Sequence, residues 1–479
     1  MFKPEPFYNR EAELQALERA WAHPAKGGQM AMVYGRRRLG KTYLLQRLVT
    51  TGDGKPACYY LAEQTSALSQ RLMLAEQLLQ AIPNTGAEPA EIAVSWNALL
   101  RFVTRHWQDP RRFVLILDEF PYLVHQSPEL PSILQAWWDR EGVHSRVMVI
   151  LCGSSLSAMR ALGGEGSPLF GRFTAGIIQI HPFRYDEVAL FYASSPHYGL
   201  WEKLTMYGIL GGTPRYHALV DTNLPMDEAV VNLLMRRASP LEHEVNYLLG
   251  TEQIREPAPY NAVLAAVARG ETQYNQIQQR TGTGGSLNHY LQQLKQLGWL
   301  REEHPFGERS TRRSLYRVAD PFLRFYYRFI HPNRSALEFS DPLDIYHRRI
   351  QPYLSVYMGE VFEEICLQWL QNRARQVFGA EILQAGRFWS RDGRVEIDIV
   401  ADMSNGSRLF AECKWSAERP VGMEVLSELQ AKTLLARRLT EGIQPVYAIF
   451  SVGGFTEPLL ALAREQPHNL SLIGPDKLL

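Results

Sequence analysis

One octapeptide constrains the fold more than any other feature of this 479-residue chain. It reads Gly-Arg-Arg-Arg-Leu-Gly-Lys-Thr and lies between an apolar run, Met30–Tyr34, and a helical pattern, Thr42–Val49. Glycines let backbone N–H groups point at phosphate oxygens, and the positive end of the following helix favours anions. The lysine would contact the β- and γ-phosphates, and the threonine hydroxyl would bind Mg²⁺. We therefore expect the loop to bind a nucleotide through Gly35, Arg36, Arg37, Arg38, Leu39, Gly40, Lys41, Thr42 and Tyr43.

A second motif weakens the alternative that this loop is only a glycine turn before a helix. The apolar run Phe113–Leu117 is followed by Asp118 and Glu119, as in a buried strand that delivers acids to the carboxyl edge of a parallel sheet. We expect Asp118 to hold Mg²⁺ through water and Glu119 to polarise the attacking water. Together the two motifs predict a nucleoside triphosphate site.

Apolar strand-like runs alternate with amphipathic helices up to about residue 195, which predicts an α/β fold with a doubly wound parallel sheet. One run ends in Gly153-Ser154-Ser155, and Ser154 would lie between the strand of the lysine and the acidic strand, beside the γ-phosphate. Arg172 is either a residue that neutralises transition-state charge, in its own or a neighbouring subunit, or a surface arginine. The expected strands are Met30–Tyr34, Ala57–Leu61, Phe113–Leu117, Val147–Cys152 and Ile177–Ile180.

These motifs resemble the archaeal-type ATPase family, a branch of the AAA+ and STAND-like P-loop ATPases found in archaea and bacteria. The resemblance covers roughly the first half of the chain and implies Mg²⁺-dependent ATP hydrolysis. It implies ATP rather than GTP, because the chain contains no Asn-Lys-x-Asp guanine motif. It also implies that Arg10 and Pro214 line the adenine side of the pocket, and it leaves the arginine finger unassigned. The residues that carry it are 9–14, the glycine loop, 118–120, 153–155 and 211–214.

The middle of the chain changes from helical patterns to a mixed pattern. Residues 200–255 are predicted to be all helical, with helices at Leu200–Leu210 and Pro225–Leu234. Three short helices and a hairpin then predict a winged helix-turn-helix, followed by an aromatic helix, Phe322–Ile330, and a polar linker, His331–Ser335. The winged-helix elements are expected at Asn261–Ala268, Tyr274–Thr281, Ser286–Leu297, Trp299–Arg301 and Ser314–Val318.

The third of these helices is the expected recognition helix. Its leucines recur at helical spacing and would form the inner face, while polar residues on the other face could reach DNA base edges. The arginines of the expected wing, Glu308–Arg313, could contact phosphates. Many winged helices bind only proteins, so contact with DNA remains one of two alternatives. The inner residues are Leu287, Leu291 and Leu294, and the outer ones are Ser286, Asn288, His289 and Gln292.

Two strand-like runs near the C-terminal end contain Asp398 and Glu412, and Lys414 shares one strand face with Glu412. Two acids and a lysine would bind Mg²⁺ and orient water for attack on a phosphodiester. The pattern resembles the PD-(D/E)XK nuclease fold, which implies that Glu363 is the helix glutamate, Asp398 and Glu412 the metal ligands and Lys414 the catalytic lysine. No proline precedes Asp398, which departs from that fold's pattern, and an edge hairpin with alternating charges is the alternative.

Composition excludes several classes of protein. The chain has 51 Lys and Arg against 50 Asp and Glu, with 46% hydrophobic and 21% charged residues, which excludes a disordered chain. It has no apolar run of about 20 residues, and its first residues are not a secretion signal. Four scattered cysteines without a Cys-x-x-Cys pair predict neither a disulfide scaffold nor a zinc site. We expect a cytoplasmic protein without a membrane partner.

The sequence thus predicts four regions: a P-loop ATPase core (1–197), a helical lid (198–256), a winged helix-turn-helix with a linker helix (257–335) and an α/β restriction-endonuclease-like domain (336–479). The predicted function is ATP-driven or ATP-gated handling of DNA, with protein partners and homo-oligomers left open. The alternative is a slow STAND-like nucleotide switch, an assembly scaffold with protein partners and a degenerate nuclease domain.

Overall fold

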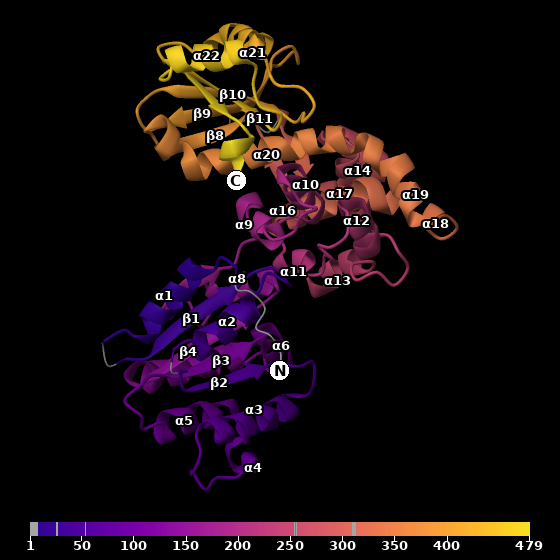
Figure 1. Ribbon diagram of the computed structural model, residues 1–479. Coiled ribbons are helices and arrows are strands. Elements are labelled where there is room, and N and C mark those ends of the chain that lie inside the picture. The colour runs from indigo at the N-terminus through magenta and orange to yellow at the C-terminus, as the bar shows by residue number, and fades with distance from the viewer. Residues whose placement is uncertain (1–7, 25–26, 53, 253, 255, 309–312) are drawn as a thin grey trace. The chain divides into compact units, whose positions relative to one another are not determined.

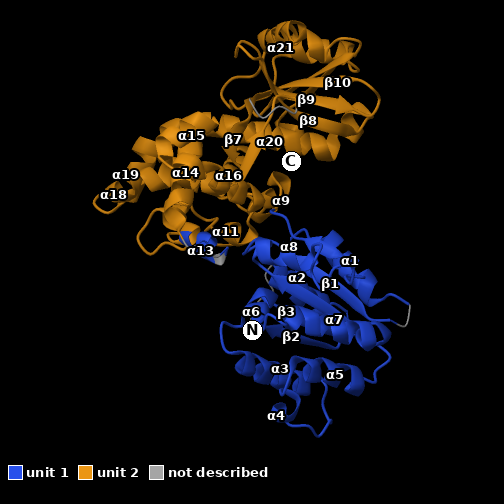
Figure 2. Ribbon diagram, turned by 180° about the vertical axis from the view of Figure 1, so that it is seen from behind, with its two compact units in different colours: residues 1–182, 246–254 blue, residues 183–245, 255–479 orange. Residues whose placement is uncertain are grey.

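The computed structural model describes residues 8–24, 27–52, 54–252, 254, 256–308 and 313–479, which form two compact units (Figure 2). Unit 1 contains the described parts of residues 1–182 and 246–254, and unit 2 those of 183–245 and 255–479. Across the described residues, no helix has the length and apolar character needed to cross a bilayer.

Unit 1 is built on a five-stranded parallel sheet with the order β2-β3-β4-β1-β5 (Figure 1). This confirms the predicted parallel α/β sheet, and it places β4 between β1 and β3. The strands are β1 (Gln29–Tyr34), β2 (Ala57–Leu61), β3 (Phe113–Asp118), β4 (Val147–Gly153) and β5 (Ile177–Gln179). The helices are α1 (Glu11–Trp21), α2 (Lys41–Thr50), α3 (Ala67–Ala81), α4 (Pro89–Ile92), α5 (Trp96–His106), α6 (Phe120–Gln126), α7 (Leu130–Arg140), η1 (Gly142–His144) and α8 (Leu156–Gly163).

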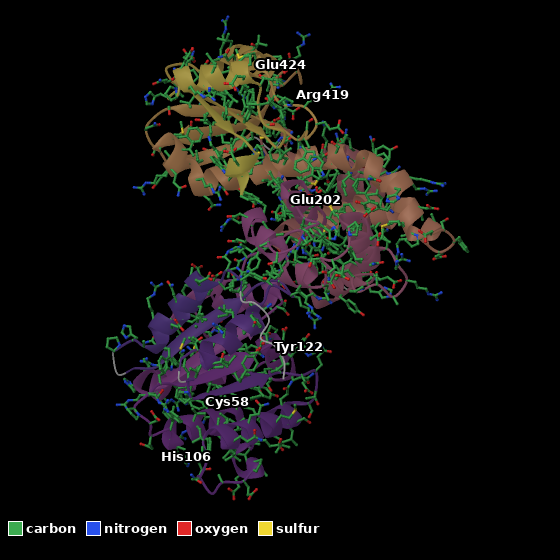
Figure 3. All side chains as sticks on the ribbon, viewed as in Figure 1. Cys58, His106, Tyr122, Glu202, Arg419 and Glu424 are labelled. Atoms are coloured by element: carbon green, nitrogen blue, oxygen red, sulfur yellow. The ribbon has the colours of Figure 1, made fainter. Side chains whose placement is uncertain are left out.

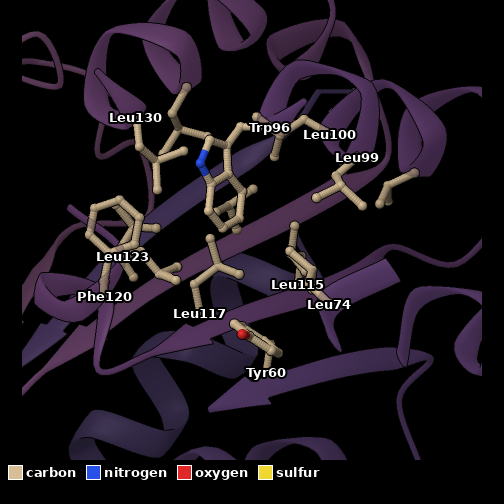
Figure 4. Close-up of a cluster of buried hydrophobic side chains, with 14 of the residues drawn as sticks. Tyr60, Leu74, Trp96, Leu99, Leu100, Leu115, Leu117, Phe120, Leu123 and Leu130 are labelled. Atoms are coloured by element: carbon tan, nitrogen blue, oxygen red, sulfur yellow. The ribbon is translucent and has the colours of Figure 1, made fainter. Parts of the chain in front are cut away.

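Both faces of this sheet are covered, because alternate residues of the interior strand β3 enter different apolar clusters. Leu115 and Leu117 pack with Trp96 and other side chains of α3 and α5 (Figure 4). Ile116, between them, packs with Leu44 of α2 on the other face. A strand buried on both faces has no polar alternation, which is why β3 is a continuous apolar run.

Unit 2 begins with a helical region, as the sequence predicts for residues 200–255. The first long helix has the predicted bounds, Leu200–Leu210. Most of the last one, α13, groups with unit 1. The elements are α9 (Tyr185–Ala189), η2 (Leu190–Tyr192), α10 (Leu200–Leu210), α11 (Pro214–Ala218), α12 (Met226–Leu234) and α13 (Glu244–Thr251).

Three helices and an antiparallel hairpin follow, and they lie close to the predicted ranges. The leucine face of the third helix is buried, as expected. The elements are α14 (Pro257–Ala268), α15 (Tyr274–Thr281), η3 (Gly284–Ser286), α16 (Leu287–Gln296), β6 (Leu300–Glu303) and β7 (Leu315–Val318).

The predicted polar linker at His331–Ser335 has a helical conformation, with a 3-10 helix at His331–Asn333 and an α-helix from Arg334. The aromatic residues before it are buried, whereas residues 331–335 are exposed or partly exposed. The long helix α20 also begins eight residues before the predicted start at Gly359. The elements are α17 (Pro321–Phe325), the π-helical η5 (Tyr326–Ile330), η6 (His331–Asn333), α18 (Arg334–Leu337), α19 (Pro342–Ile345), η7 (Tyr346–Ile350) and α20 (Gln351–Phe378).

A second five-stranded sheet, of mixed direction, ends the chain with the order β12-β11-β10-β9-β8. Strands β8, β9 and β10 are antiparallel neighbours, whereas β10, β11 and β12 run parallel. Helix α20 packs on β8, β9 and β10, and α21, which carries Glu424 in its first turn (Figure 3), packs on β9 and β10. The elements are β8 (Ile382–Trp389), β9 (Glu396–Met403), β10 (Arg408–Lys414), α21 (Met423–Leu435), η8 (Arg437–Leu439), β11 (Pro445–Ser451), α22 (Glu457–Glu465), β12 (Leu470–Ile473) and α23 (Pro475–Leu478).

The loop of the β6–β7 hairpin joins the core of this second sheet. Phe306 is 4% exposed and packs with Phe388 and Phe410, and its N–H donates to the Arg387 carbonyl oxygen at 2.8 Å. The loop is therefore a structural part of the C-terminal domain.

We expect Phe306→Ala to lower the free energy of unfolding by about 3 kcal/mol, because removing a buried ring leaves a cavity. Urea denaturation with circular dichroism measures the change. Phe339→Ala is the matched control, since that ring is 87% exposed and its loss should change stability by less than about 0.5 kcal/mol. Equal losses in the two variants would contradict the docking of the loop.

Candidate functional site

The glycine loop has a backbone that only glycine allows at two points. A Cβ atom on Gly35 would lie 2.4 Å from the Ile180 carbonyl oxygen, and Gly40 has a φ of +86°. Gly40 also precedes the first turn of α2, so the loop leads directly into a helix N-terminus. The arrangement is that of an anion-binding loop, as the sequence predicts. Of the other loop residues, Leu39 is buried, Arg37 is exposed, and Arg36, Arg38 and Tyr43 are partly buried.

Lys41 is held inside this loop. Its side chain is buried, and its Nζ donates to the carbonyl oxygens of Gly35 at 2.8 Å and Arg36 at 3.0 Å. Burial lowers the pKa of Lys41, and the carboxylates of Asp118 and Glu119 oppose this shift. The ammonium group is thus oriented by its own loop and weakly solvated, which strengthens its attraction to an anion.

Thr42 and Asp118 face each other across the loop. The Thr42 hydroxyl donates to Asp118 Oδ2 at 3.0 Å, and Asp118 is 1% exposed at the end of β3. A hydroxyl beside a carboxylate is the hard oxygen donor set that Mg²⁺ prefers, so the residues fit this ion.

Tyr59 is a third member of this group, and the sequence analysis missed it. Its hydroxyl donates to the same oxygen of Asp118, from the neighbouring strand β2. Burial raises the pKa of Tyr59 well above its usual range, and Asp118 adds to this shift. The phenol therefore stays protonated and can donate. A tyrosine in an apolar strand gives no sign of this role until the order of the strands is known.

Glu119 and Ser154 form the second contact of the site. The Ser154 hydroxyl donates to Glu119 Oε1 at 2.8 Å and lies 2.9 Å from Oε2. Glu119 has a φ of +51°, in the left-handed region that side chains other than glycine seldom adopt. Such strain persists where the surroundings hold it, often at functional sites. Ser154 thus lies beside the acid that is expected to act on water.

Glu252 is another residue that the sequence analysis missed. Its carboxylate accepts from the N–H of Leu156 at 3.4 Å and the hydroxyl of Ser157 at 3.4 Å, at the start of α8. Burial raises the pKa of Glu252, and these hydrogen bonds oppose the shift. The contact joins residues about 95 positions apart, so no local pattern predicts it.

The remaining nucleotide-site predictions have different outcomes. Arg10 is buried and donates to the carbonyl oxygen of His181 at 2.6 Å, and another of its contacts, to the Leu39 carbonyl at 3.5 Å, brings it to the glycine loop. Arg172 forms a double hydrogen bond with Asp139 of α7, at 2.9 and 2.8 Å. Its expected role on a phosphate stays a prediction.

Pro214 opens α11 in unit 2, and the turn before it is fixed within that unit. His217 Nε2 donates to the Gly211 carbonyl oxygen at 2.7 Å, and the Tyr192 hydroxyl lies 2.7 Å from Nδ1. This pairing assigns a neutral imidazole with its proton on Nε2. Burial lowers the pKa of His217 to about 4, although the bond to Gly211 opposes the shift.

We expect this histidine to make stability depend on pH. The unfolded chain binds a proton at His217 below about pH 6.5, whereas the folded chain does so only near pH 4. The unfolded state then holds more protons, so the free energy of unfolding falls by about 3 kcal/mol as the pH drops through this window. Denaturation of the wild type and His217→Gln at several pH values measures the difference. Parallel curves for the two proteins would contradict the buried neutral histidine.

The predicted C-terminal carboxylates come together in unit 2. Strands β9 and β10 pair antiparallel, and Asp398 Oδ2 accepts from the Cys413 N–H at 2.8 Å. Burial and the charge of Glu412 raise the pKa of Asp398 to about 6. Burial and Asp398 also raise the pKa of Glu363 on α20, whose carboxylate lies 3.1 Å from Arg387 Nε.

Glu412 binds two ammonium groups. Lys414 and Lys432 each donate to its Oε1 at 3.0 Å, and the second of these lysines, from α21, was not predicted from the sequence. Over the described part of the chain, no three His, Cys, Asp or Glu side chains form a group that could hold a metal ion. Asp398 and Glu412 supply two carboxylates, and Mg²⁺ is commonly held by one or two with water completing its shell.

One of the three arginines of the expected wing makes contacts within unit 2. Arg313, expected at a phosphate, donates to the Trp389 carbonyl oxygen at 2.8 Å and pairs with Glu308 at 3.3 Å. The side chains of Arg313 and Glu308 are both partly buried. Arg309 and Arg312 lie outside the described residues. On α16 and just before it, Ser286, Asn288, His289 and Gln292 are exposed, as expected.

Two family profiles match the chain. Residues 7–220 match one described as an ATPase domain predominantly from Archaea, and this range contains the glycine loop, Asp118, Glu119 and Ser154. Residues 326–432 match one described as archaeal and bacterial proteins of unknown function. The second range ends at Lys432.

Individual proteins are similar as well. The uncharacterized protein MJECL04 of Methanocaldococcus jannaschii is 30% identical over 415 residues, which cover 85% of this chain and 87% of that protein. The ORC1-type DNA replication protein 6 of Halobacterium salinarum is 26% identical over 175 residues, 35% of this chain and 46% of that protein. Among solved structures, the Walker-type ATPase PABY2304 of Pyrococcus abyssi has a TM-score of 0.51 and 19% identity, covering 67% of this chain and 96% of that one.

This last likeness, at 19% identity, shows a shared fold. The relative of 30% identity extends along nearly the whole chain rather than over one motif. The chain therefore belongs to the archaeal-type ATPase family, with the family's ATPase domain followed by a C-terminal region shared with archaeal and bacterial proteins of unknown function.

Proposed function

We propose that this protein binds Mg-ATP in unit 1 and hydrolyses it, and that its nucleotide state controls the handling of DNA by unit 2. One observation carries the first part. Lys41, Thr42, Asp118 and Glu119 converge at the carboxyl ends of β1 and β3, and Ser154 joins them from β4, which lies between these strands.

In this proposal the reaction is in-line attack of water on the γ-phosphate. Lys41 attracts the β- and γ-phosphate oxygens, and Glu119 orients the water and accepts its proton. The Ser154 hydroxyl, 2.8 Å from that carboxylate, fixes where the acid points. Mg²⁺, held through Thr42 and Asp118, would supply neutralisation of phosphate charge.

Three observations support DNA as the partner. The helices α14 to α16 and the β6–β7 hairpin have the order of a winged helix-turn-helix, and the polar face of α16 is exposed. The relative from Halobacterium salinarum is named a DNA replication protein. In this proposal α16 would enter a groove, while Phe306 of the hairpin loop packs in the core of the second sheet.

An ATPase assay with single-stranded, duplex and branched DNA tests this part, with Lys41→Ala as the inactive control. We expect DNA to stimulate turnover, with an effect that declines steeply as salt rises, because phosphate contacts release counterions. Turnover that no form of DNA changes, together with nucleotide-dependent oligomerisation, would instead support the nucleotide switch.

A second candidate activity is Mg²⁺-dependent cleavage of DNA by unit 2. Burial and the charge of Glu412 raise the pKa of Asp398 to about 6, which favours this activity, because a divalent cation beside Asp398 would relieve the repulsion from Glu412. Asp398 and Glu412 would hold the ion, and Lys414, next to them on β10, would stabilise charge on the attacked phosphate.

We expect Asp398→Asn and Lys414→Ala each to lower DNA cleavage by at least about a hundredfold while ATP hydrolysis is unchanged. Gel assays of plasmid and branched DNA measure cleavage. Asp392→Asn is the matched control, because that carboxylate is exposed in the loop before β9. A wild-type protein that cuts no form of DNA would show that this site is structural.

A further inference from the structure

An arginine-lined cavity lies in unit 2, and its lining residue Glu360 is one helical turn from Glu363 on α20. It has a volume of about 140 Å³ and is bounded by the C-terminal end of α14, strand β7, α17, η5 and α20. Four arginines line it, against a single acid, Glu360. They are Arg269, Arg317, Arg324 and Arg328.

Arg324 is the residue that points most strongly to a ligand. It is 4% exposed, its Nη2 donates to Glu364 at 2.6 Å and its Nε to the Val318 carbonyl oxygen at 3.1 Å. Its remaining terminal nitrogen, Nη1, is buried and has no hydrogen-bond acceptor among the described residues. A buried charged donor without a partner is costly, and an anion in the adjoining cavity would supply the acceptor.

The acids nearby are already shared between arginines. Glu360 accepts from Arg328 at 3.0 Å and lies 3.9 Å from Arg317, which also pairs with Glu303 at 3.1 Å. Glu364 lies 2.6 Å from both Arg301 and Arg324. Arg269 is exposed at the cavity rim and forms no ion pair within the described residues. The cavity thus keeps an excess of positive charge.

We propose that this cavity binds a phosphate group, carried either by the DNA backbone or by a free phosphorylated small molecule. Guanidinium groups present paired donors that match the oxygens of phosphate, and several of them converge here. The cavity has room for a phosphate group. The inference goes beyond the proposed function, because none of the carboxylates of the C-terminal site and no residue of α16 lines this cavity.

The test uses the full chain in a Lys41→Ala background, so that the loop of unit 1 does not compete for phosphate. Calorimetric titration with inorganic phosphate forms one arm, and duplex DNA binding at several salt concentrations forms the other. The variants are Arg269→Gln, which removes an exposed and unpaired charge, and Arg328→Gln. Arg375→Gln is the control for net charge, because that side chain is 80% exposed near the end of α20.

We expect Arg269→Gln and Arg328→Gln to weaken the binding of either inorganic phosphate or duplex DNA about tenfold. Arg375→Gln should change neither affinity. Weaker phosphate binding with unchanged DNA affinity identifies a free phosphorylated ligand. Weaker DNA binding, with a salt slope lowered by about one, identifies a backbone phosphate. Variants that match Arg375→Gln in both arms overturn the proposal. We also expect Arg269→Gln, with Lys41 intact, to hydrolyse ATP at the wild-type rate. A failure of the cavity proposal can therefore be told apart from a failure of the proposed ATPase activity.

Discussion

Lys41→Ala will lower kcat/KM for ATP hydrolysis by at least about a thousandfold and will remove measurable ATP binding. One preorganised hydrogen-bond donor to the charge that develops in the transition state raises the rate by about a hundredfold to a thousandfold. A buried ammonium group should raise the rate more than a neutral donor does. The group is desolvated and oriented by the carbonyls of Gly35 and Arg36, so no other residue replaces it. Equilibrium binding of a fluorescent ATP analogue and steady-state turnover measure the two effects.

Arg37→Ala is the matched control for this variant. Arg37 lies in the same loop and carries the same charge, but its side chain is exposed. We expect a change of less than about fivefold, because an exposed charge is screened by solvent. Lys41→Ala should be as thermally stable as the wild type, since the pKa of Lys41 is lowered by burial and its charge is costly to the fold. A stable Lys41→Ala protein that still binds ATP would contradict the site.

Local patterns predicted the elements of unit 1 well because its strands carry unbroken apolar runs. The strand Ala57–Leu61 of unit 1 has the predicted bounds. In unit 2 the helices Leu200–Leu210 and Tyr274–Thr281 have theirs as well. Strand β8 was missed, since Ile382–Trp389 is interrupted by Gly386 and has mostly partly exposed side chains. Such a strand differs little from a loop until its neighbour β9 pairs with it.

The residues of the candidate site also fall into two groups, those that a local sequence motif identifies and those that only the fold brings to the site. Lys41, Thr42, Asp118 and Glu119 lie in short motifs whose spacing fixes their geometry, so the sequence identifies them. Tyr59 reaches Asp118 only because β2 lies next to β3, and no residue spacing records that order. Three other contacts depend on long-range packing in the same way. They are the hydrogen bonds of Glu252 to the start of α8, the bond of Lys432 to Glu412, and the packing of Phe306 in the core of the C-terminal sheet.

Glu119→Gln separates ATP binding from hydrolysis. The glutamine carbonyl oxygen can still accept from the Ser154 hydroxyl, so the geometry of the site is kept while the basic carboxylate is lost. We expect turnover to fall by about a hundredfold to a thousandfold, with ATP affinity within about threefold of the wild type. Single-turnover hydrolysis and equilibrium binding measure the two quantities. Turnover that survives this change would exclude Glu119 as the residue that orients water.

Ser154→Ala completes a double-variant cycle with Glu119→Gln. If the hydroxyl acts by holding the carboxylate, Ser154→Ala alone lowers turnover by about tenfold, and it adds nothing in the Glu119→Gln background. If Ser154 instead contacts the γ-phosphate, as its place at the end of β4 also allows, its loss lowers turnover in both backgrounds and weakens ATP binding. The hydrogen bond at 2.8 Å favours the first result, because a hydroxyl has one proton and donates it to Glu119 here.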